Sequence, residues 1–456
     1  MQRRHFVQSA AAASLAAVPQ LTSAQGGNAR PFRVGLIGAG WYGKVDLLRL
    51  LQVRETEVVA LADPDSKMAE EAAGIIASRQ PSGRTPQTMG DYRELLKLEG
   101  LDAVLIDTPD HWHALPMIDA CRAGLDVWVQ KPISVDVAEG AAMVRAARET
   151  GRVVQVGLQR RSTPHLIDAK TQVVDAGLLG EIAHAEVCCY YHMRPQNNPE
   201  PTAPPSHLDY ERWTGPAPMR PYTELHHPRR WRAFMEYSNG IVGDMCVHMY
   251  DTVRWLLGMG WPQQVTSEGG ILVQTDALAN TTDTQVATFD HTHEQLPQAP
   301  RGLNVQWTHR SWGDPPDADY PWAFTLYGSK GTLKGDVHKF EFTPHRGQGE
   351  PLRGEAVYEY DQYPEDKDEK DLERHVASAI RGHMRNWLDC IESREQPVAN
   401  IETAHVSTAS CILANLSLEL GRSLAWDPDA GRVIDDDEAN ARLARPYRDG
   451  YKHPGA

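Results

Sequence analysis

The chain has 456 residues and a formal net charge of −15, and 41% of its residues are hydrophobic. This length and apolar content suit two domains, and the acidic charge argues against a nucleic-acid binder, which needs a basic face. Six cysteines in a chain of this length do not make a disulfide scaffold, so we interpret them as structural residues.

The first residues have the pattern of an export signal. Arg3 and Arg4 precede a short apolar run from Ala10 to Val18, and Thr22-Ser-Ala24 resembles a cleavage site. This order is typical of a twin-arginine signal peptide, and the apolar run is too short to cross a bilayer. We expect residues 1–24 to direct export by the twin-arginine machinery to the periplasm or beyond. The alternative is a disordered N-terminus that carries two arginines by chance. No later segment is long enough to predict a membrane span.

A glycine turn follows the first predicted strand. Val34 to Ile37 is a short apolar run, and Gly38, Gly40 and Gly43 after it fit the pattern G-x-G-x-x-G. These glycines allow a tight turn, the approach of a pyrophosphate, and packing of the next helix on the strand. Free N–H groups at the start of that helix favour an anion. The sequence therefore predicts a nicotinamide dinucleotide site that also includes Ala39, Trp41 and Tyr42; the alternative is a glycine turn in another α/β unit.

A second predicted strand, Glu57 to Ala62, ends in Asp63. An acid at this place accepts the ribose 2′-hydroxyl of NAD, and no arginine follows it directly to bind the 2′-phosphate of NADP. We therefore expect NAD rather than NADP as the cofactor.

From residue 58 to residue 157 the pattern alternates between strands and helices, as in a doubly wound parallel sheet. Candidate cofactor ligands stand at the carboxyl ends of strands, where such sheets bind ligands. They are Thr108, Pro109 and His113 after one strand, and Gln130 and Lys131 after the next. The predicted helices are Met68–Ser78, Gly90–Leu98, Ala114–Ala123 and Val137–Thr150, and the predicted strands are Leu101–Asp107, Asp126–Val129 and Val153–Gly157.

The second half of the chain carries candidate substrate ligands. Arg161, in the run Gln159-Arg-Arg161, follows the last strand of the first half and should enter the cleft; the alternative is a basic pair on the surface. The proline-rich stretch Arg194–Pro205 predicts a loop over the site. Trp231 offers a ring on which the C–H face of a sugar can stack, although loop aromatics also serve simply as packing.

Asp244 and His248 are four residues apart in a predicted helix, so they share one helical face. An acid that orients an imidazole, opposite Lys131 at a strand end, is a plausible proton-transfer group. The alternative is an ordinary surface pair. We expect no catalytic metal, because no histidine, cysteine and carboxylate spacing typical of a metal site stands out.

Several motifs occur in the order of one family: the glycine turn, Thr108-Pro-Asp-His-Trp-His113, Gln130-Lys-Pro132, Gln155-Val-Gly157 and Gly243-Asp-x-x-x-His248. From about Arg33 to Leu424 the chain resembles the oxidoreductases named for glucose–fructose oxidoreductase, inositol dehydrogenase and rhizopine catabolism protein (Gfo/Idh/MocA). The resemblance implies an N-terminal Rossmann domain, expected at residues 30–158. It also implies a C-terminal α/β domain with an open, mainly antiparallel sheet, expected at residues 159–456, and this sheet commonly forms homo-oligomers in the family.

The resemblance also implies a reaction. The carbon that bears a hydroxyl of a sugar, sugar derivative or cyclitol would pass a hydride to NAD(P). Lys131, Asp244 and His248 would be the catalytic residues, and His248 would also contact the substrate. We expect His248 to act as the base, Lys131 to orient the hydroxyl and Asp244 to fix the imidazole. The family usually reads Glu-Lys-Pro, whereas this chain has Gln130 before Lys131.

If the protein is exported, it should leave the cytoplasm with its cofactor already bound, because no free nicotinamide pool is expected outside. We call this a carried cofactor. A tightly bound cofactor must be regenerated in each turnover. A sugar oxidoreductase with a second substrate satisfies this condition, and so does an enzyme that cleaves glycosides by transient oxidation and elimination. A third possibility is a binding protein that keeps the fold without turnover.

Overall fold

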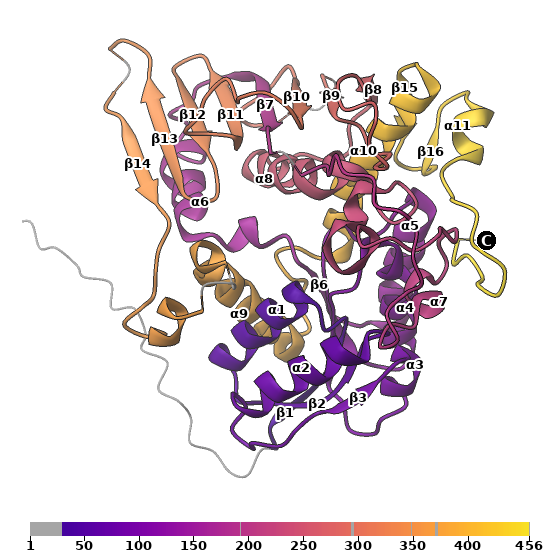
Figure 1. The fold of residues 1–456 in the computed structure, drawn as a ribbon. Coiled ribbons are helices and arrows are strands. Elements are labelled where there is room, and N and C mark those ends of the chain that lie inside the picture. The colour runs from indigo at the N-terminus through magenta and orange to yellow at the C-terminus, as the bar shows by residue number, and fades with distance from the viewer. Residues whose placement is uncertain (1–29, 192, 293–295, 348, 370–372, 456) are drawn as a thin grey trace, which may run out of the picture. The chain divides into compact units, whose positions relative to one another are not determined.

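The computed structural model describes residues 30–191, 193–292, 296–347, 349–369 and 373–455 (Figure 1). The predicted signal peptide, residues 1–24, lies outside the described residues. Residues from Phe32 onward pack as one compact unit, so the expected domain limits of 30–158 and 159–456 stay a prediction. Within the described part of the chain, no helix has both the length and the apolar character needed to cross a bilayer.

The N-terminal half forms a parallel sheet with the strand order β3-β2-β1-β4-β5-β6. The order reverses between β1 and β4, and open α/β sheets bind ligands at the carboxyl ends of strands beside such a reversal. The predicted doubly wound sheet is therefore confirmed. Its strands are β1 (Phe32–Ile37), β2 (Thr56–Ala62), β3 (Gln87–Met89), β4 (Ala103–Ile106), β5 (Asp126–Val129) and β6 (Val154–Val156).

Local capping fixes where the helices of this half begin and end. The Asp65 carboxylate accepts the amides of Lys67 and Met68 at the start of α2, and Gly151 ends α5 in the left-handed conformation. The helix expected from Gly90 to Leu98 is shorter, because Asp91 caps its start. The helices are α1 (Trp41–Val53), α2 (Ser66–Ala77), α3 (Tyr92–Leu95), α4 (Ala114–Arg122) and α5 (Val137–Thr150).

The C-terminal half forms a second sheet with the order β14-β13-β12-β11-β7-β10-β9-β8-β15-β16. Strands β7 and β10 run parallel, and the other described pairs in this sheet run antiparallel, which confirms the predicted architecture. Buried and less buried residues alternate along β10, so one face of the sheet packs on the core. The strands are β7 (Ile182–Cys189), β8 (Gln264–Gly270), β9 (Thr284–His291), β10 (Leu303–Arg310), β11 (Trp322–Gly328), β12 (Gly331–Gly335), β13 (Lys339–Pro344), β14 (Leu352–Glu355), β15 (Leu424–Asp427) and β16 (Arg432–Val433).

Helices from the end of the chain complete the packing of both sheets. Helix α10 packs against β8 and against α5, while α9 packs against α1. The indole rings of Trp128 on β5 and Trp387 on α9 lie 5.9 Å apart in one buried cluster. The N-terminal sheet thus depends on residues after 377 for part of its apolar cover. The helices of this half are α6 (Pro164–Ala169), α7 (Tyr210–Thr214), α8 (Val247–Leu257), α9 (Ala377–Ser393), α10 (Ile401–Leu420) and α11 (Asp437–Ala441). The six cysteines are all free.

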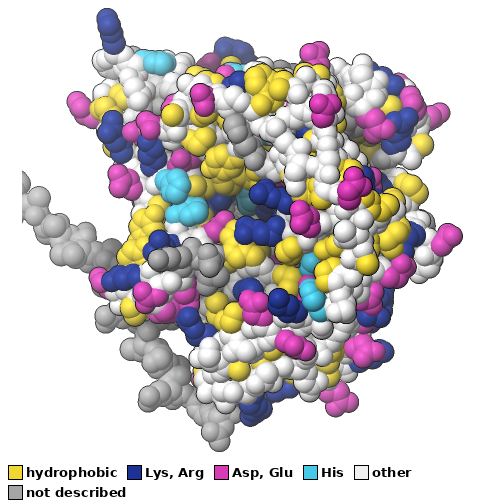
Figure 2. Space-filling view, in the orientation of Figure 1, with side chains coloured by type: hydrophobic (Ala, Val, Ile, Leu, Met, Phe, Trp, Pro, Cys, Tyr) yellow, Lys and Arg dark blue, Asp and Glu magenta, His cyan; other side chains and the backbone are white. Residues whose placement is uncertain are grey.

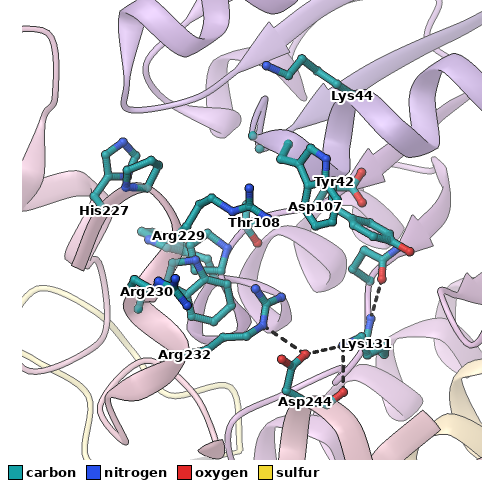
Figure 3. A pocket seen from close by; sticks show the side chains of 18 of the residues that line it. Tyr42, Lys44, Asp107, Thr108, Lys131, His227, Arg229, Arg230, Arg232 and Asp244 are labelled. Carbon is teal, nitrogen blue, oxygen red and sulfur yellow. Dashed lines mark hydrogen bonds and ion pairs between the residues drawn. The ribbon is translucent and has the colours of Figure 1, made fainter. Parts of the chain in front are cut away.

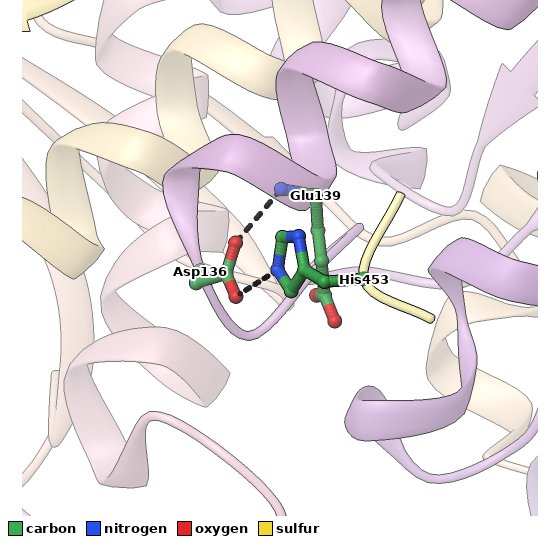
Figure 4. A group of neighbouring side chains, drawn as sticks. All are labelled: Asp136, Glu139 and His453. Carbon is green, nitrogen blue, oxygen red and sulfur yellow. Dashed lines mark hydrogen bonds and ion pairs between the residues drawn. The ribbon is translucent and has the colours of Figure 1, made fainter. Parts of the chain in front are cut away.

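Asp136, Glu139 and His453 are neighbours that hold the C-terminal segment on α5 (Figure 4). Asp136 accepts the Glu139 amide at 2.7 Å and, through its other oxygen, His453 Nε2 at 2.9 Å and the Arg445 amide at 2.9 Å. Glu139 accepts the Val135 amide at 2.9 Å and the hydroxyl of a tyrosine in the same C-terminal segment, Tyr447. Because every carboxylate oxygen already has a protein partner, we interpret this group as a structural contact rather than a metal site.

This contact should depend on pH. Burial alone would lower the pKa of His453, but the hydrogen bond and charge of Asp136 outweigh it and raise the pKa. A group whose pKa rises on folding contributes its full stabilisation below its unfolded pKa of about 6.5 and loses it as the pH rises through the folded value. We expect His453→Asn to lower the free energy of unfolding by about 1–2 kcal/mol at about pH 5.5 and by much less at about pH 9. Urea titrations measure both differences, and equal values would contradict the charged contact.

Candidate active site

A cavity of about 880 Å³ opens at the carboxyl ends of β1, β2 and β4. Its far wall comes from the C-terminal half, through α8 and the start of β11. Figure 2 shows a hollow near the middle of this face, with blue Lys and Arg side chains around it. The cavity thus lies where a parallel sheet binds a dinucleotide, and the second half of the chain faces the same space.

The glycine turn has the geometry of a phosphate cradle. Gly38 has φ +95°, and a Cβ there would lie 2.6 Å from the backbone of Asp107, so no other residue fits. A Cβ on Gly43 would lie 2.1 Å from the Gly38 carbonyl oxygen, which explains the close packing of α1 on the turn. Gly40 lines the cavity, and no side chain caps α1, so its first amides are available to an anion. These residues fit the pyrophosphate of a dinucleotide.

Asp63 lies at the end of β2 and lines the cavity. Its two carboxylate oxygens accept the amides of Ala39 and Asp65, each at 2.8 Å. Burial raises the pKa of Asp63 to about 6 despite these hydrogen bonds. The carboxylate therefore holds the glycine turn in place while its remaining lone pairs face the position expected for a ribose hydroxyl.

A buried polar network lies beneath the turn. Asp46 on α1 accepts Trp128 Nε1 at 2.7 Å and Gln130 Nε2 at 2.5 Å through the same oxygen. The side-chain oxygen of Gln130, Oε1, accepts the Lys131 amide at 3.3 Å. Burial and the neighbouring Asp46 raise the pKa of Asp107 at the end of β4. Gln130 is thus tied to a carboxylate supplied by a helix, directly before the lysine.

Lys131 is paired with Asp244 across the cavity (Figure 3). Lys131 Nζ donates to the Asp244 carboxylate at 2.6 Å and to its carbonyl oxygen at 3.0 Å, and Arg232 Nε lies 3.2 Å from the same carboxylate. Burial would raise the pKa of Asp244, but the charges of Lys131 and Arg232 outweigh it and lower the pKa. Asp244 is therefore an ionised carboxylate shared by two cations.

His248 lines the same cavity and is 5% exposed. Its ring stands edge-on to Trp322 with 5.5 Å between centroids, and its buried Nδ1 has no hydrogen-bond partner among the described residues. Burial, followed by the charges of Lys131, Arg160 and Arg232, lowers its pKa well below the usual value. The imidazole is therefore neutral near pH 7 and can accept a hydrogen bond from a hydroxyl, although the same charges disfavour its protonated form.

Asp244 does not orient His248, contrary to the prediction from their spacing. Its carboxylate is bound to Lys131 and Arg232 instead. The reason is local: Asp244 lies in a π-helical turn, η6 (Val242–Cys246), and α8 begins only after it. A π-turn has a wider repeat than an α-helix, so residues four apart no longer stand directly above one another.

Two further predicted ligands have other roles. Arg161 lies outside the cavity lining, because its guanidinium makes two 2.8 Å bonds to Asp251 on α8 and one to the Val398 carbonyl. His113 also lies outside the lining, and its ring nitrogens contact the carbonyls of Pro132 and Thr108 at 2.6 and 2.9 Å. In this structure both residues hold the loops of the site, and the substrate contact of Arg161 and the cofactor contact of His113 stay predictions.

The remaining predicted residues divide into cavity lining and support. Ala39 and Gly43 act through the backbone of the glycine turn, as described above. The lining includes Gly38, Gly40, Trp41, Tyr42, Asp63, Thr108, Pro109, Gln130, Lys131, Trp231, Asp244 and His248.

Sequence reasoning missed several cations of the cavity. Arg160, rather than Arg161, lines it, and Arg229 lies over the Trp41 ring at 4.6 Å. Arg232 lies 4.0 Å over the Trp231 ring while it contacts Asp244. A basic run was visible at both places, but only the backbone geometry decides which arginine turns inward.

Two family models match the chain. One is described as an oxidoreductase family with an NAD-binding Rossmann fold and matches residues 32–158; the other is described as the C-terminal alpha/beta domain of an oxidoreductase family and matches residues 170–291 and 362–453. The chain belongs to the Gfo/Idh/MocA oxidoreductase family.

Individual family members agree with this assignment. An inositol 2-dehydrogenase from Rhizobium meliloti is 28% identical over 53% of this chain and 59% of its own length. A glycosyl hydrolase family 109 protein from Stenotrophomonas maltophilia is 30% identical over 42% of this chain and 43% of its own length. The chain thus spans little more than half of the first of these relatives and less than half of the second.

A solved structure shares the fold. The WlbA dehydrogenase from Bordetella pertussis, in complex with NADH and UDP-GlcNAcA, superposes with a TM-score of 0.59 at 20% identity. The superposition covers 87% of this chain and 98% of that one.

Proposed function

We propose that this protein is an NAD-dependent oxidoreductase that acts on a hydroxyl of a sugar, sugar derivative or cyclitol. The observation that carries the proposal is the arrangement of Lys131, Asp244 and His248 in one cavity with the glycine turn. The family and the inositol 2-dehydrogenase among the relatives support the same reaction class. A binding protein without turnover would have no need of an ion-paired lysine beside a neutral, buried histidine.

The chemistry needs two groups from this chain. Bound NAD⁺ would accept a hydride from the carbon that bears the hydroxyl. Lys131, held by Asp244, donates a hydrogen bond to the hydroxyl oxygen and orients it. His248 removes the hydroxyl proton, so the carbon loses two electrons with its hydrogen and a carbonyl forms. In the reverse direction His248 returns that proton.

A segment of the C-terminal half covers the ribose end of the cofactor site and supports tight binding. Asp65, two residues after Asp63, contacts His207 Nδ1 at 2.9 Å and His227 Nε2 at 2.8 Å. The Ser66 amide donates to the His207 carbonyl at 2.9 Å. A nucleotide at Asp63 would leave only after this segment moves, which suits a carried cofactor in a protein exported by the twin-arginine route. Arg194 is the first residue of the proline-rich loop after β7 and lines the cavity. That this loop lies over the bound ligand is part of the same proposal.

Homo-oligomer formation is a further part of the proposal. Val286 on β9 and Tyr327 on β11 are exposed large side chains of the open sheet. The outward face also carries polar residues such as Thr288 and Gln306, so the proposal of a second copy at this face rests on the open sheet and the family resemblance rather than on an apolar patch.

A second candidate is an enzyme that cleaves glycosides by transient oxidation and elimination, which a glycosyl hydrolase relative favours. The two candidates differ in net redox change. A nitrophenyl glycoside that releases nitrophenol without accumulation of NADH would favour the second candidate, and steady NADH production from a free sugar would favour the first.

We expect His248→Ala to lower kcat by about 100- to 10,000-fold, because it removes the base. The affinity for NAD⁺ should stay within about twofold, since binding at the glycine turn does not involve the imidazole. His345→Ala, at an exposed histidine directly after β13, is the matched control. Steady-state kinetics and calorimetry measure both quantities, and unchanged turnover would remove His248 from the mechanism.

Asp63 should set the preference for NAD⁺ over NADP⁺. Its charge repels a 2′-phosphate, and because its pKa is raised to about 6, that charge is lost as the pH falls through about 6. We expect the ratio of the NADP⁺ Kd to the NAD⁺ Kd to fall in acid for the wild-type protein. The ratio should change less in Asp63→Ser, and the change that remains in this variant measures titration of the 2′-phosphate itself. Glu55→Gln, an exposed acid, is the control. Equal pH dependence in all three proteins would contradict this role.

A carried cofactor should survive purification. Protein purified without added nucleotide and without dialysis should release near-stoichiometric NAD(H) on denaturation, as read by mass and absorbance. His227→Ala, which frees one contact of the covering segment, should retain less cofactor after gel filtration. An empty wild-type protein that binds NAD⁺ only weakly would overturn tight binding and count against export, the prediction from which tight binding follows.

A further inference from the structure

The guanidinium of Arg160 is a buried cation that forms no ion pair among the described residues. The residue is 4% exposed and lines the cavity, and its buried Nε and Nη1 atoms form no hydrogen bond within the described part of the chain. Two nearby buried arginines differ from it: Arg161 binds Asp251, and Arg194 binds three backbone carbonyls. A buried charge without a partner is unfavourable, so its presence on a cavity wall points to an anion supplied by a ligand.

Arg160 belongs to the substrate side of the cavity. Its guanidinium lies 5.2 Å over the Trp322 ring, the same indole against which His248 stands at 5.5 Å. The Trp322 Nε1 donates to the Met245 carbonyl at 3.1 Å, which fixes the indole between the two. A ligand whose reacting hydroxyl meets His248 can therefore place another group against Arg160.

No protein carboxylate neutralises Arg160. None lies within ion-pair distance of it among the described residues, and the two acids that face it from other elements are Glu373 and Asp336. Asp336 accepts amides of its own turn at 2.7 and 2.8 Å. Burial raises the pKa of Glu373 although the charge of Arg160 lowers it, and no ion pair joins the two side chains among the described residues. Asp244 is already shared by Lys131 and Arg232.

We propose that the substrate is an acidic sugar, a uronic or aldonic acid, whose carboxylate pairs with Arg160 while its reacting hydroxyl meets Lys131 and His248. A guanidinium donates two parallel N–H bonds that match the two oxygens of a carboxylate. A phosphate dianion is the alternative anion, and the nearby Glu373 disfavours its two negative charges more than the single charge of a carboxylate. The contact of the reacting hydroxyl with Lys131 and His248 rests on the proposed function. The binding of the carboxylate by Arg160 does not.

Binding tests the inference without turnover. With the NAD-loaded protein, melting temperatures are compared in matched sugars that differ in one group: glucuronate with glucose, galacturonate with galactose, and gluconate with glucitol. We expect at least one acid to stabilise the wild-type protein more than its neutral partner. Arg160→Met should weaken binding of that acid by about 10- to 100-fold and leave the neutral sugar within about threefold. Arg160→Lys should restore part of the loss, and Arg353→Met, an exposed arginine on β14, should change nothing.

Stability without substrate separates a binding role from a structural one. Because Arg160→Met removes an unpaired buried charge, its melting temperature should equal or exceed that of the wild-type protein when no sugar is present. A lower melting temperature, or an equal loss of acid and neutral sugars, would overturn the inference. So would weaker NAD⁺ binding in the variant, or a preference for sugar phosphates over all acids tested. Protection by an acid that reduces no cofactor would support this binding site and contradict the proposed oxidation instead.

Discussion

The carboxylate of Asp244 is the interaction on which the catalytic end of the cavity depends. It lies in the π-helical turn before α8 and meets Lys131, which follows β5, and Arg232, which precedes that turn in the chain. One ionised acid thereby joins the nucleotide-binding half to the substrate-binding half. His248, one helical turn further along, is left neutral by burial and by the nearby cations. A charged donor and a neutral acceptor of protons then face the same space.

A second constraint is the buried polar network of Asp46 and Gln130 beneath the glycine turn. The family usually has a glutamate where this chain has Gln130, and the loss of that carboxylate removes a possible charge partner for Lys131. Asp46 on α1 supplies a carboxylate in the same network, and Gln130 connects it to the Lys131 amide. A Cβ at Gly157 would lie 2.5 Å from the Gln130 side chain, so the glycine at the end of β6 makes room for this arrangement. In this chain a carboxylate from α1 therefore belongs to the network directly before Lys131.

The fold could be predicted because its signals are local. Apolar runs, the glycine turn and the acid at the end of β2 specify a parallel sheet and its binding edge within about 30 residues of one another. Strand β3 was not predicted, because it is a short, largely exposed strand at the edge of the sheet and has no apolar run. The site was predicted only in part, because the hydrogen-bond partner of each side chain depends on packing between residues that are far apart in the sequence. Arg160 and Arg161 are neighbours in sequence, yet one is unpaired in the cavity and the other binds Asp251.

Direct transfer of hydrogen from the substrate to the nicotinamide is the central claim, and isotopic labelling measures it most directly. The NAD-loaded protein would be mixed with sugars and sugar acids that carry deuterium on a single carbinol carbon, then denatured, and the released cofactor would be weighed by mass spectrometry. One labelled position of one substrate should yield a cofactor heavier by one deuterium, and His248→Ala should reduce the rate at which it forms. If no labelled substrate passes deuterium to the cofactor while bound NAD⁺ is present, the assignment of this cavity as an oxidoreductase site is wrong.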